Sequence, residues 1–308
     1  MLSRISIVIS TRNRCDDVVV ALESCLAQNY PDFEVLLYDD ASTDGTVDVV
    51  RQQFPEVKLL ASDTRRGYLV WRNSGFRDAT GDIVISIDDD AYFTDRGTLA
   101  RVAELFRIFP EAGAFALPYV EPACDSKSRC TSAVPSGAAV RSYTGCAHAI
   151  RRELALKVGG YPEFLVHQGE ERHLCLRLLA AGYATLMADT SPIVHLFSPK
   201  RDRGRVDYYG YRNTLLFTWL VTPRQYVLPR LLIDSAQLMK YRFQLRTVPR
   251  RLRAISAGWF AIWKYRHHRN PVSRPTYLAF RSYPSHGPLA RIPLVPPLRR
   301  RVPRFTDS

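Results

Sequence analysis

The chain lacks the features that mark secreted, membrane-spanning and dinucleotide-binding proteins. Its six cysteines contain no CxxC pair and are too sparse in 308 residues for a disulfide scaffold, so we expect free thiols in a reducing compartment. The longest later apolar runs, 215–221 and 254–263, are far shorter than the ~20 residues of a spanning helix, and no signal peptide is recognisable at the apolar run 5–10. Neither GxGxxG nor GxxxxGK[ST] occurs. These absences predict a cytoplasmic protein.

Acidic residues are scarce in the last third of the chain. Residues 199–308 carry 23 Lys and Arg against four Asp and no Glu, a net charge of +19, whereas residues 1–198 carry 20 basic and 26 acidic residues, a net charge of −6. With 46% hydrophobic residues, the chain is long enough for one large domain with an appendage. We therefore expect an acidic body that performs the chemistry and a basic tail attracted to an anionic partner, either a membrane surface or nucleic acid.

Residues 5–188 alternate short β-branched runs with longer segments of helical periodicity. This alternation predicts an α/β fold with a Rossmann-like, mostly parallel sheet and helices on both faces. The expected strands are 5–10, 34–38, 57–61, 83–87, 114–117 and 184–188, and the expected helices are 17–28, 45–54, 68–79, 98–109, 152–158 and 170–181. A surface loop is expected at 121–139, and aromatic and basic helical segments at 208–220, 228–245 and 252–265.

Polar and acidic residues collect directly after three expected strands. They are Thr11 and Arg12 after the first, Asp39, Asp40 and Asp44 after the second, and Asp88, Asp89 and Asp90 after the fourth. Residues that follow parallel strands meet at one edge of a sheet, so the six carboxylates are expected to share one crevice. Such clustered oxygen ligands suit Mg²⁺ or Mn²⁺ together with substrate phosphates. The alternative, that the acids cap the following helices, stays open for Asp44.

Six runs in register carry a resemblance to a known family. ISIVISTRNR, EVLLYDDASTDGT, RRGYLVWRNSG and GDIVISIDDDAYF resemble the nucleotide-sugar half of the family 2 glycosyltransferases, which have a GT-A fold, and GEERHLCLRLLAAGY and PIVHLFS resemble the acceptor half. The resemblance covers about residues 3–220. The segment 208–213 is similar to the aromatic-Arg-Asn segment of rhamnosyltransferase-like bacterial members, where its role is mostly packing.

The resemblance implies roles for individual residues. Thr11, Asp39 and Arg72 would contact the base and ribose of the nucleotide, Asp88 would face the ribose, and Asp90 and His195 would hold a divalent metal, Mn²⁺ or Mg²⁺. The full donor-binding set that we expect is Thr11, Arg12, Asp39, Asp40, Arg72, Asp88 and Asp89. For Arg72 a helix-surface position is the open alternative, and for His195 an ordinary structural role.

The first turn of the expected helix 170–181 carries the candidate catalytic bases. Glu171, our first choice, and Glu170 stand where the family has a Glu-Asp pair, and His173 replaces an Asp that usually follows. Apolar residues follow Glu171 at spacings of three, four and seven, which predicts that it lies on the inward edge of the helix. A carboxylate that takes the acceptor proton opposite the leaving group predicts inversion. The alternative is a solvated first turn, since acids suit helix N-termini.

These expectations divide the chain into a GT-A glycosyltransferase domain at 1–203 and a basic helical extension at 204–308. The leading hypothesis is an inverting, metal-dependent hexosyl- or rhamnosyltransferase that uses a nucleotide-sugar donor and a glycan or lipid-linked acceptor in surface polysaccharide biosynthesis. The segment 252–265 suits peripheral contact with an anionic membrane, with a solvated basic cover on the body as the alternative.

Two other classes of function remain as alternatives. A nucleic-acid-binding protein could use the basic tail, but the acidic edge of the sheet argues against it. A catalytically degenerate glycosyltransferase that acts as a binding module is supported by the departure at His173 alone.

Overall fold

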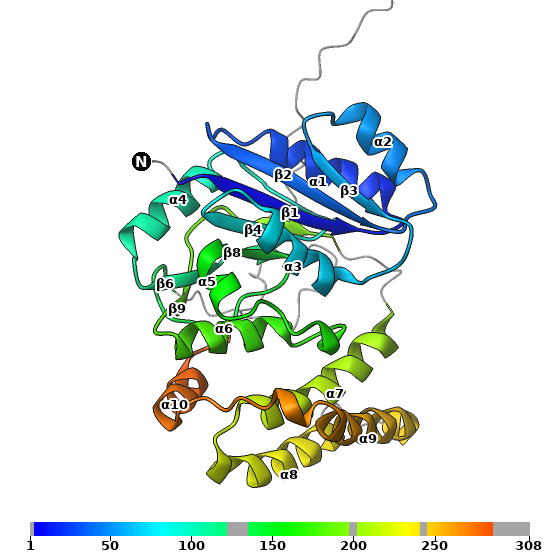
Figure 1. Ribbon diagram of the computed structural model, residues 1–308, viewed down its shortest axis with the longest axis vertical. Helices are drawn as coiled ribbons and strands as arrows, with labels where there is room; N and C mark the ends of the chain where they lie inside the picture. The colour runs from blue at the N-terminus through cyan, green and yellow to red at the C-terminus, as the bar shows by residue number, and fades with distance from the viewer. Residues whose placement is uncertain (1–2, 122–134, 197–201, 241–244, 286–308) are drawn as a thin grey trace, which may run out of the picture.

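The computed structural model describes residues 3–121, 135–196, 202–240 and 245–285, and it confirms the α/β architecture with a mostly parallel central sheet (Figure 1). The strands of the large sheet are β1 (Ile5–Thr11), β2 (Phe33–Asp40), β3 (Lys58–Ser62), β4 (Ile83–Ile87), β6 (Ala112–Ala116), β8 (Ala147–Arg151) and β9 (Ala184–Met187). Their order is β3-β2-β1-β4-β8-β6-β9, and β8 alone runs antiparallel to its neighbours among these strands. Most of the predicted loop 121–139 lies outside the described residues.

Helices cover both faces of the sheet, and each face has its own apolar core. One face carries α1 (Cys15–Leu26), α2 (Thr46–Gln53) and α4 (Thr98–Ile108), and the other carries α3 (Tyr68–Asp78), α5 (Arg152–Lys157) and α6 (Glu170–Ala180). Alternate side chains of β1 enter different cores, with Ile7 and Ile9 on the α1 side and Val8 on the α3 side. Since both faces are covered, β4 and β6 are buried throughout, in keeping with their mostly apolar sequences.

A second, three-stranded sheet joins distant segments of the chain and was not expected from the sequence. It contains β5 (Ala91–Tyr92), β7 (Tyr119–Val120) and β10 (Ile193–His195) in the order β5-β10-β7. The strand β10 pairs antiparallel with β5 and parallel with β7. The residues that directly follow β4, β7 and β10 are thereby brought together.

The C-terminal helices form a layer on the side of α6 away from the sheet (Figure 1). They are α7 (Arg203–Val221), α8 (Arg224–Lys240), α9 (Val248–Lys264) and α10 (Arg274–Ser282), with short 3-10 turns at Leu245–Thr247 and Arg266–His268. A further 3-10 turn, Glu163–Leu165, precedes α6. Leu215 of α7, Ala261 of α9 and Tyr277 of α10 belong to the same apolar core as the α3 side of the sheet. No described helix is long and apolar enough to cross a membrane.

Four cysteines, Cys15, Cys25, Cys146 and Cys175, have free thiols. Cys124 and Cys130 lie outside the described residues. The division into domains 1–203 and 204–308 stays a prediction, although α7 begins close to that border and Asp202 accepts a hydrogen bond from the Arg205 amide at 3.0 Å as its N-cap.

Candidate active site

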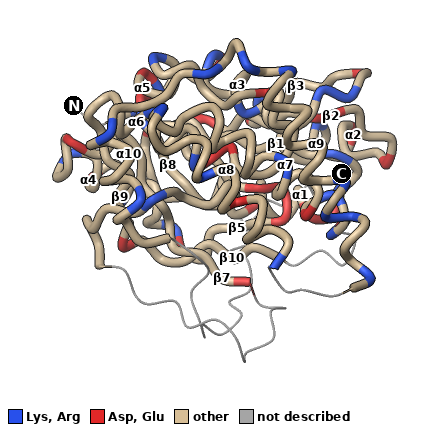
Figure 2. Tube along the Cα trace, turned by 90° about the horizontal axis from the view of Figure 1, so that it is seen from below, with Lys and Arg blue, Asp and Glu red and all other residues tan. Residues whose placement is uncertain are grey.

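The small sheet explains how His195 reaches the acids that follow β4. His195 ends β10 and lies opposite Ala91 in the register with β5. The Leu196 amide donates a hydrogen bond to the Asp90 carbonyl at 2.8 Å, which fixes the two segments side by side. Glu121 directly follows β7, the other neighbour of β10. These three short strands bring four acids together beside His195, and we call Asp88, Asp89, Asp90 and Glu121 the acid cluster. Figure 2 shows the cluster beside β5 and α1.

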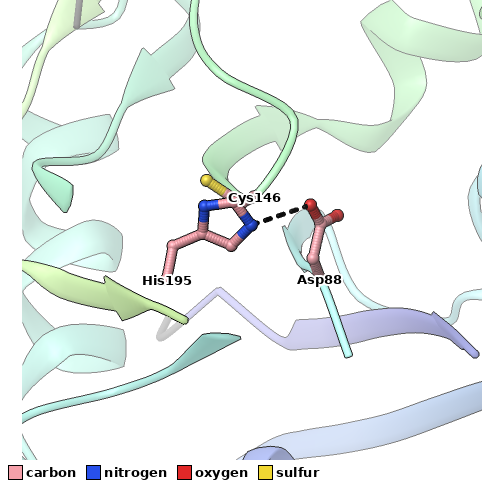
Figure 3. A group of neighbouring side chains, drawn as sticks. All are labelled: Asp88, Cys146 and His195. Atoms are coloured by element: carbon pink, nitrogen blue, oxygen red, sulfur yellow. Dashed lines mark ion pairs between the residues drawn. The ribbon is translucent and has the colours of Figure 1, made fainter. Parts of the chain in front are cut away.

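Two aspartates lie close to one nitrogen of His195. His195 Nε2 lies 3.3 Å from Asp90 Oδ1 and 3.8 Å from Asp88 Oδ2. Adjacent ligands of one octahedral Mg²⁺ at about 2.1 Å are about 3 Å apart, so each of these two pairs has nearly the spacing of neighbouring metal ligands. Figure 3 shows His195 between the Asp88 carboxylate and the Cys146 sulfur, with their ligand atoms within 4.8 Å of one another. Of these three groups, the Asp88 carboxylate and the His195 imidazole are the ligand types that suit Mg²⁺ or Mn²⁺, whereas a thiol suits softer metals.

The surroundings of His195 favour a positive charge. His195 Nδ1 lies 3.2 Å from Glu121 Oε1, so both ring nitrogens face carboxylates. Burial alone would lower the pKa of His195, but the hydrogen bonds to Asp90 and Glu121 and the charge of Asp88 raise it to about 10. Burial would raise the pKa of Asp90, but His195 and Arg14 outweigh burial and lower it. A bound divalent ion would replace the His195 proton and leave the neutral imidazole as a ligand.

Arg14 was missed in the sequence analysis, although it ends the first run that carries the resemblance. Its guanidinium pairs with the Asp90 carboxylate and lies 3.5 Å from Asp89 Oδ1. Burial raises the pKa of Asp89 to about 7, with Arg14 opposing the rise and Asp90 and Asp88 adding to it. Arg12, which we had expected in the donor site, is exposed. Glu121 was also missed, because no pattern in the sequence indicated the short strand that precedes it.

Thr11 and Asp39 lie side by side at the carboxyl edge of the sheet, paired in the register of β1 and β2. Both are buried. Asp39 Oδ1 accepts a hydrogen bond from the Ser42 amide at 2.9 Å, whereas Oδ2 is buried without a hydrogen-bond partner among the described residues. A buried acceptor without a donor costs about 1–3 kcal/mol, so Asp39 Oδ2 is suited to a ligand that supplies an N–H or O–H group.

Asp40 and Asp44 are engaged in turns and do not join the acid cluster. Asp40 Oδ1 accepts hydrogen bonds from the Arg66 amide at 2.6 Å and the Trp71 indole at 2.8 Å, and so shapes the turn before α3. Asp44 accepts from the amides of Thr46 and Cys15, the first residues of α2 and α1, both at 3.2 Å, although the N-cap position of α2 itself is Gly45. The hydrogen bonds and ion pairs therefore do not gather all six carboxylates. Donor binding by Asp40 stays a prediction.

Arg72 connects the acid cluster to α6. Its Nη2 donates hydrogen bonds to Asp88 Oδ1 at 2.7 Å and to the Gly145 carbonyl at 3.0 Å, and its Nη1 lies 3.5 Å from Glu170 Oε1. The guanidinium also lies over the Tyr68 ring, 4.9 Å from its centroid. The side chain is buried, so the helix-surface alternative is wrong. Arg72 holds Asp88 in place on one side and Glu170 on the other.

The two acids that open α6 have different surroundings. Glu170 is buried, and its Oε1 accepts a hydrogen bond from the Tyr68 hydroxyl at 2.5 Å. Burial and the neighbouring Glu171 raise the pKa of Glu170 to about 8, opposed by Arg72. Glu171 is half-buried, and burial raises its pKa as well. The solvated-turn alternative is therefore wrong for Glu170, and Glu171 is the acid more open to a ligand.

Because Gly145 has no side chain, it does not fill the space next to Arg72 and the Glu171 carboxylate. A Cβ at this position would lie 2.8 Å from an Arg72 nitrogen and 3.2 Å from Glu171 Oε1. A side chain here would therefore displace Arg72 and cover the Glu171 carboxylate. The sequence alone does not indicate this glycine, because its contacts come from α3 and α6.

The turn before α6 is held by α7. Asn213 Nδ2 lies within hydrogen-bonding distance of the carbonyls of Leu165, His167 and Gln168, at 3.0, 2.7 and 2.8 Å. The guanidinium of Arg212 donates to the Asn213 side-chain oxygen at 2.6 Å. The turn needs such support, because two of its non-glycine residues have positive φ, namely Val166 and Gln168. The aromatic-Arg-Asn segment therefore has a polar positioning role in addition to packing.

Comparison with solved structures identifies the fold. S. aureus TarS, residues 1–349, superposes with a TM-score of 0.62 at 17% identity, over 83% of this chain and 80% of that one. The mannosyltransferase PcManGT from Pyrobaculum calidifontis, solved with GDP-Man and Mn²⁺, gives a TM-score of 0.56 at 23% identity, over 92% of this chain and 79% of that one. The α/β body thus has the GT-A-like fold that the resemblance implied.

Comparison of sequences points to the same family. Residues 6–155 match the model "Glycosyl transferase family 2". The uncharacterized glycosyltransferase YibD of Escherichia coli K12 is 32% identical over 106 residues, which are 33% of this chain and 30% of that protein. The succinoglycan biosynthesis protein ExoO of Rhizobium meliloti is 37% identical over 87 residues, 28% of this chain and 25% of that protein. The chain thus aligns with less than a third of the length of either relative.

Proposed function

We propose that the chain is an inverting, metal-dependent glycosyltransferase of the hexosyl- or rhamnosyltransferase type. It would transfer a sugar from a nucleotide-sugar donor to a hydroxyl of a glycan or lipid-linked acceptor in surface polysaccharide biosynthesis. The observation that carries this proposal is the buried Arg72, which contacts both the candidate metal site through Asp88 and the candidate base helix through Glu170. Support for the donor class comes from TarS, which has been solved with UDP-GlcNAc, and from PcManGT, solved with GDP-Man.

Donor binding is proposed for the edge of the sheet formed by Thr11, Arg12, Asp39, Asp40, Arg72, Asp88 and Asp89. The unpartnered Asp39 Oδ2 supports this assignment, since the ring N–H of a base or a ribose hydroxyl would supply the missing donor. Arg72 keeps the Asp88 carboxylate in a fixed orientation toward the same edge.

Asp90 and His195 are proposed to hold Mn²⁺ or Mg²⁺, with Asp88 within reach of the same ion. Such an ion, when bound, stabilises the negative charge that develops on the diphosphate leaving group. The chain contributes an Asp90 carboxylate that stays ionised because its pKa is lowered by His195 and Arg14 against the effect of burial. Glu121 orients the His195 ring from the opposite side.

Glu171 is proposed as the general base. The acceptor oxygen would attack the anomeric carbon, the bond from that carbon to the diphosphate oxygen would break, and the hydroxyl proton would pass to Glu171. A single displacement of this kind inverts the anomeric configuration. The raised pKa makes Glu171 a stronger proton acceptor than an ordinary carboxylate, and Glu170, held by Tyr68 and Arg72, would position the helix.

The proposal can be tested with a panel of nucleotide sugars and Mn²⁺. We expect one donor to raise the thermal unfolding midpoint only when Mn²⁺ is present, and the Glu171→Gln variant to keep this stabilisation while losing transfer. Absence of stabilisation by every nucleotide sugar tested, with or without Mn²⁺, would contradict the proposal. Formation of a product that retains the anomeric configuration would contradict the single displacement.

A further inference from the structure

The outward surfaces of α8 and α9 are apolar. Seven large apolar side chains, each exposed by at least 40%, point away from the body here, and we call them the α8–α9 face: Leu228, Leu232, Ile233, Leu252, Trp259, Phe260 and Trp263. Leu228 and Leu232 are four residues apart on α8, with Ile233 next to Leu232. On α9, Leu252, Trp259 and Trp263 follow one another at spacings of seven and four, with Phe260 next to Trp259, so each helix has an apolar stripe. The most exposed of the large aromatic residues are Phe260 at 60% and Trp263 at 61%.

These stripes are not needed for packing within the described part of the chain. The opposite sides of the two helices already bury Val227 and Leu231 of α8 and Ala254 and Ala261 of α9. α8 and α9 contact each other and α7, and they form the layer farthest from the sheet in Figure 1. The exposed apolar area is therefore a surface feature, of the kind that marks an interaction site.

The charged side chains exposed on α8 and α9 are all basic. Residues 235–285 contain no Asp or Glu, and Arg250, Arg253 and Lys264 are exposed on α9, the helix that also carries the exposed aromatic side chains. The preceding acid, Asp234, is buried and paired with Arg230 Nη2 at 2.5 Å. No carboxylate on these helices would repel an anionic surface.

We infer that the α8–α9 face binds the surface of a bilayer that contains anionic lipids. Trp, Phe and Leu side chains would enter the boundary between headgroups and acyl chains, while Arg and Lys would contact lipid phosphates. The cytoplasmic leaflet is the bilayer surface whose negative charge is complementary to these basic residues. This inference goes beyond glycosyl transfer, and would bring the site close to a lipid-linked acceptor.

Two other partners fit the face less well. Nucleic acid would account for the basic residues but not for exposed Leu228, Leu232 and Phe260, which have no charge to offer a phosphate backbone. A second copy of this chain, joined through the same face, would bring the acid-free basic flanks of two molecules together, and like charges across an interface are destabilising.

The test is cosedimentation of the full chain with vesicles of phosphatidylcholine alone or mixed with phosphatidylglycerol. We expect binding only to the mixed vesicles and a loss of binding as salt is raised. The Phe260→Ser, Trp263→Ser double variant should weaken binding at least about 10-fold. The Arg250→Gln, Arg253→Gln, Lys264→Gln triple variant should weaken it about 100-fold.

Matched controls use exposed residues of the same kinds elsewhere. Ile108→Ser with Leu156→Ser removes two exposed apolar side chains from α4 and α5, and Arg51→Gln, Lys58→Gln, Arg107→Gln removes three exposed basic side chains from the body. Both controls should bind like the unchanged protein. Equal binding to neutral vesicles, equal losses in the controls, or self-association that depends on Phe260 and Trp263 would each overturn the inference. Vesicle binding requires no donor or acceptor, so its outcome is independent of the proposed transfer reaction.

Discussion

The edge of the sheet and the α8–α9 face use charge in opposite ways. At the edge, most of the charged groups are at least partly buried and several have specific partners, as Asp90 has Arg14 and His195. On the α8–α9 face, basic side chains are exposed and face no acid of their own segment. Burial strengthens electrostatic interactions and makes them dependent on geometry, whereas solvent and salt weaken those at a surface. A single substitution should therefore have a large effect at the edge and a small, additive effect on the face.

The largest effect is expected from Asp90→Asn, which removes one negative charge from the proposed metal site without changing the size of the side chain. The transfer rate at saturating donor should fall at least about 1,000-fold, because the charge on the leaving group is no longer compensated. Initial rates over a range of Mn²⁺ concentrations measure this effect. Asp44→Asn is the control, because an Asn side-chain oxygen can still accept hydrogen bonds from the Thr46 and Cys15 amides. Loss of activity in the control would mean that the whole acidic edge is needed.

The next effect distinguishes the two acids of α6. Glu171→Gln should lower kcat about 100- to 10,000-fold, the usual contribution of a general base, with donor binding unchanged. Glu170→Gln should retain more activity, because an amide oxygen can still accept the hydrogen bond from Tyr68. Steady-state rates and donor-dependent thermal shifts of both variants provide the measurement. A larger loss in Glu170→Gln than in Glu171→Gln would assign the base to Glu170.

A smaller effect on rate is expected where α7 supports the base-bearing helix. Asn213→Ala removes the side chain that holds three carbonyls of the turn, so kcat should fall about 10-fold while the KM for donor stays constant. Thr218→Ala is the control on the same helix, since it removes one buried hydrogen bond to Asp234 at 2.6 Å. The control should lower the free energy of unfolding by about 1–3 kcal/mol and leave kcat unchanged. Equal kcat in both variants would show that the turn needs no positioning by Asn213.

The sequence predicted the central sheet better than the small one, for a physical reason. β1 and β4 are buried on both faces and are rich in Ile and Val, a pattern that is visible in the sequence. The strands β5, β7 and β10 have only two or three residues, and distant pairing partners rather than local patterns determine them. His195 was therefore predicted as a site residue from the family resemblance, and not from the periodicity of the sequence.

The turns that follow the strands decided which acids joined the cluster. Asp39 and Asp40 are adjacent in sequence, but Asp40 accepts hydrogen bonds from the turn before α3 while one oxygen of Asp39 has no described partner. Ala41, directly after them, has a φ of 64°, a backbone conformation that the sequence does not indicate for alanine. The position of these acids directly after the strands predicted that they lie at the edge of the sheet. The direction in which each side chain points depends on the local backbone geometry.

Because Glu170 is buried, the free energy of unfolding should depend on pH. Burial raises the folded-state pKa of Glu170 from 4.5 to about 8, so between these values the folded protein holds a proton that the unfolded chain has lost. The free energy of unfolding contributed by this group is full below pH 4.5 and falls as the pH rises toward about 8, by up to about 1.4 kcal/mol per pH unit. Glu170→Gln removes this contribution, so the variant should gain stability relative to the unchanged protein as the pH rises. Urea unfolding across this range measures the difference, and parallel curves would show that Glu170 is ionised throughout.

The smallest effect is expected on the α8–α9 face and completes the comparison. Arg250 is exposed, so Arg250→Gln should weaken binding to phosphatidylglycerol-containing vesicles only about 5-fold and leave the unfolding midpoint and the transfer rate in solution unchanged. Combined with Arg253→Gln, the two losses should multiply, because exposed charges that do not contact each other act independently. Titration with vesicles at low and high salt measures both variants. If Arg250→Gln alone abolished binding, Arg250 would occupy a specific lipid pocket. The charges on the α8–α9 face would then depend on specific partners, as those at the edge of the sheet do.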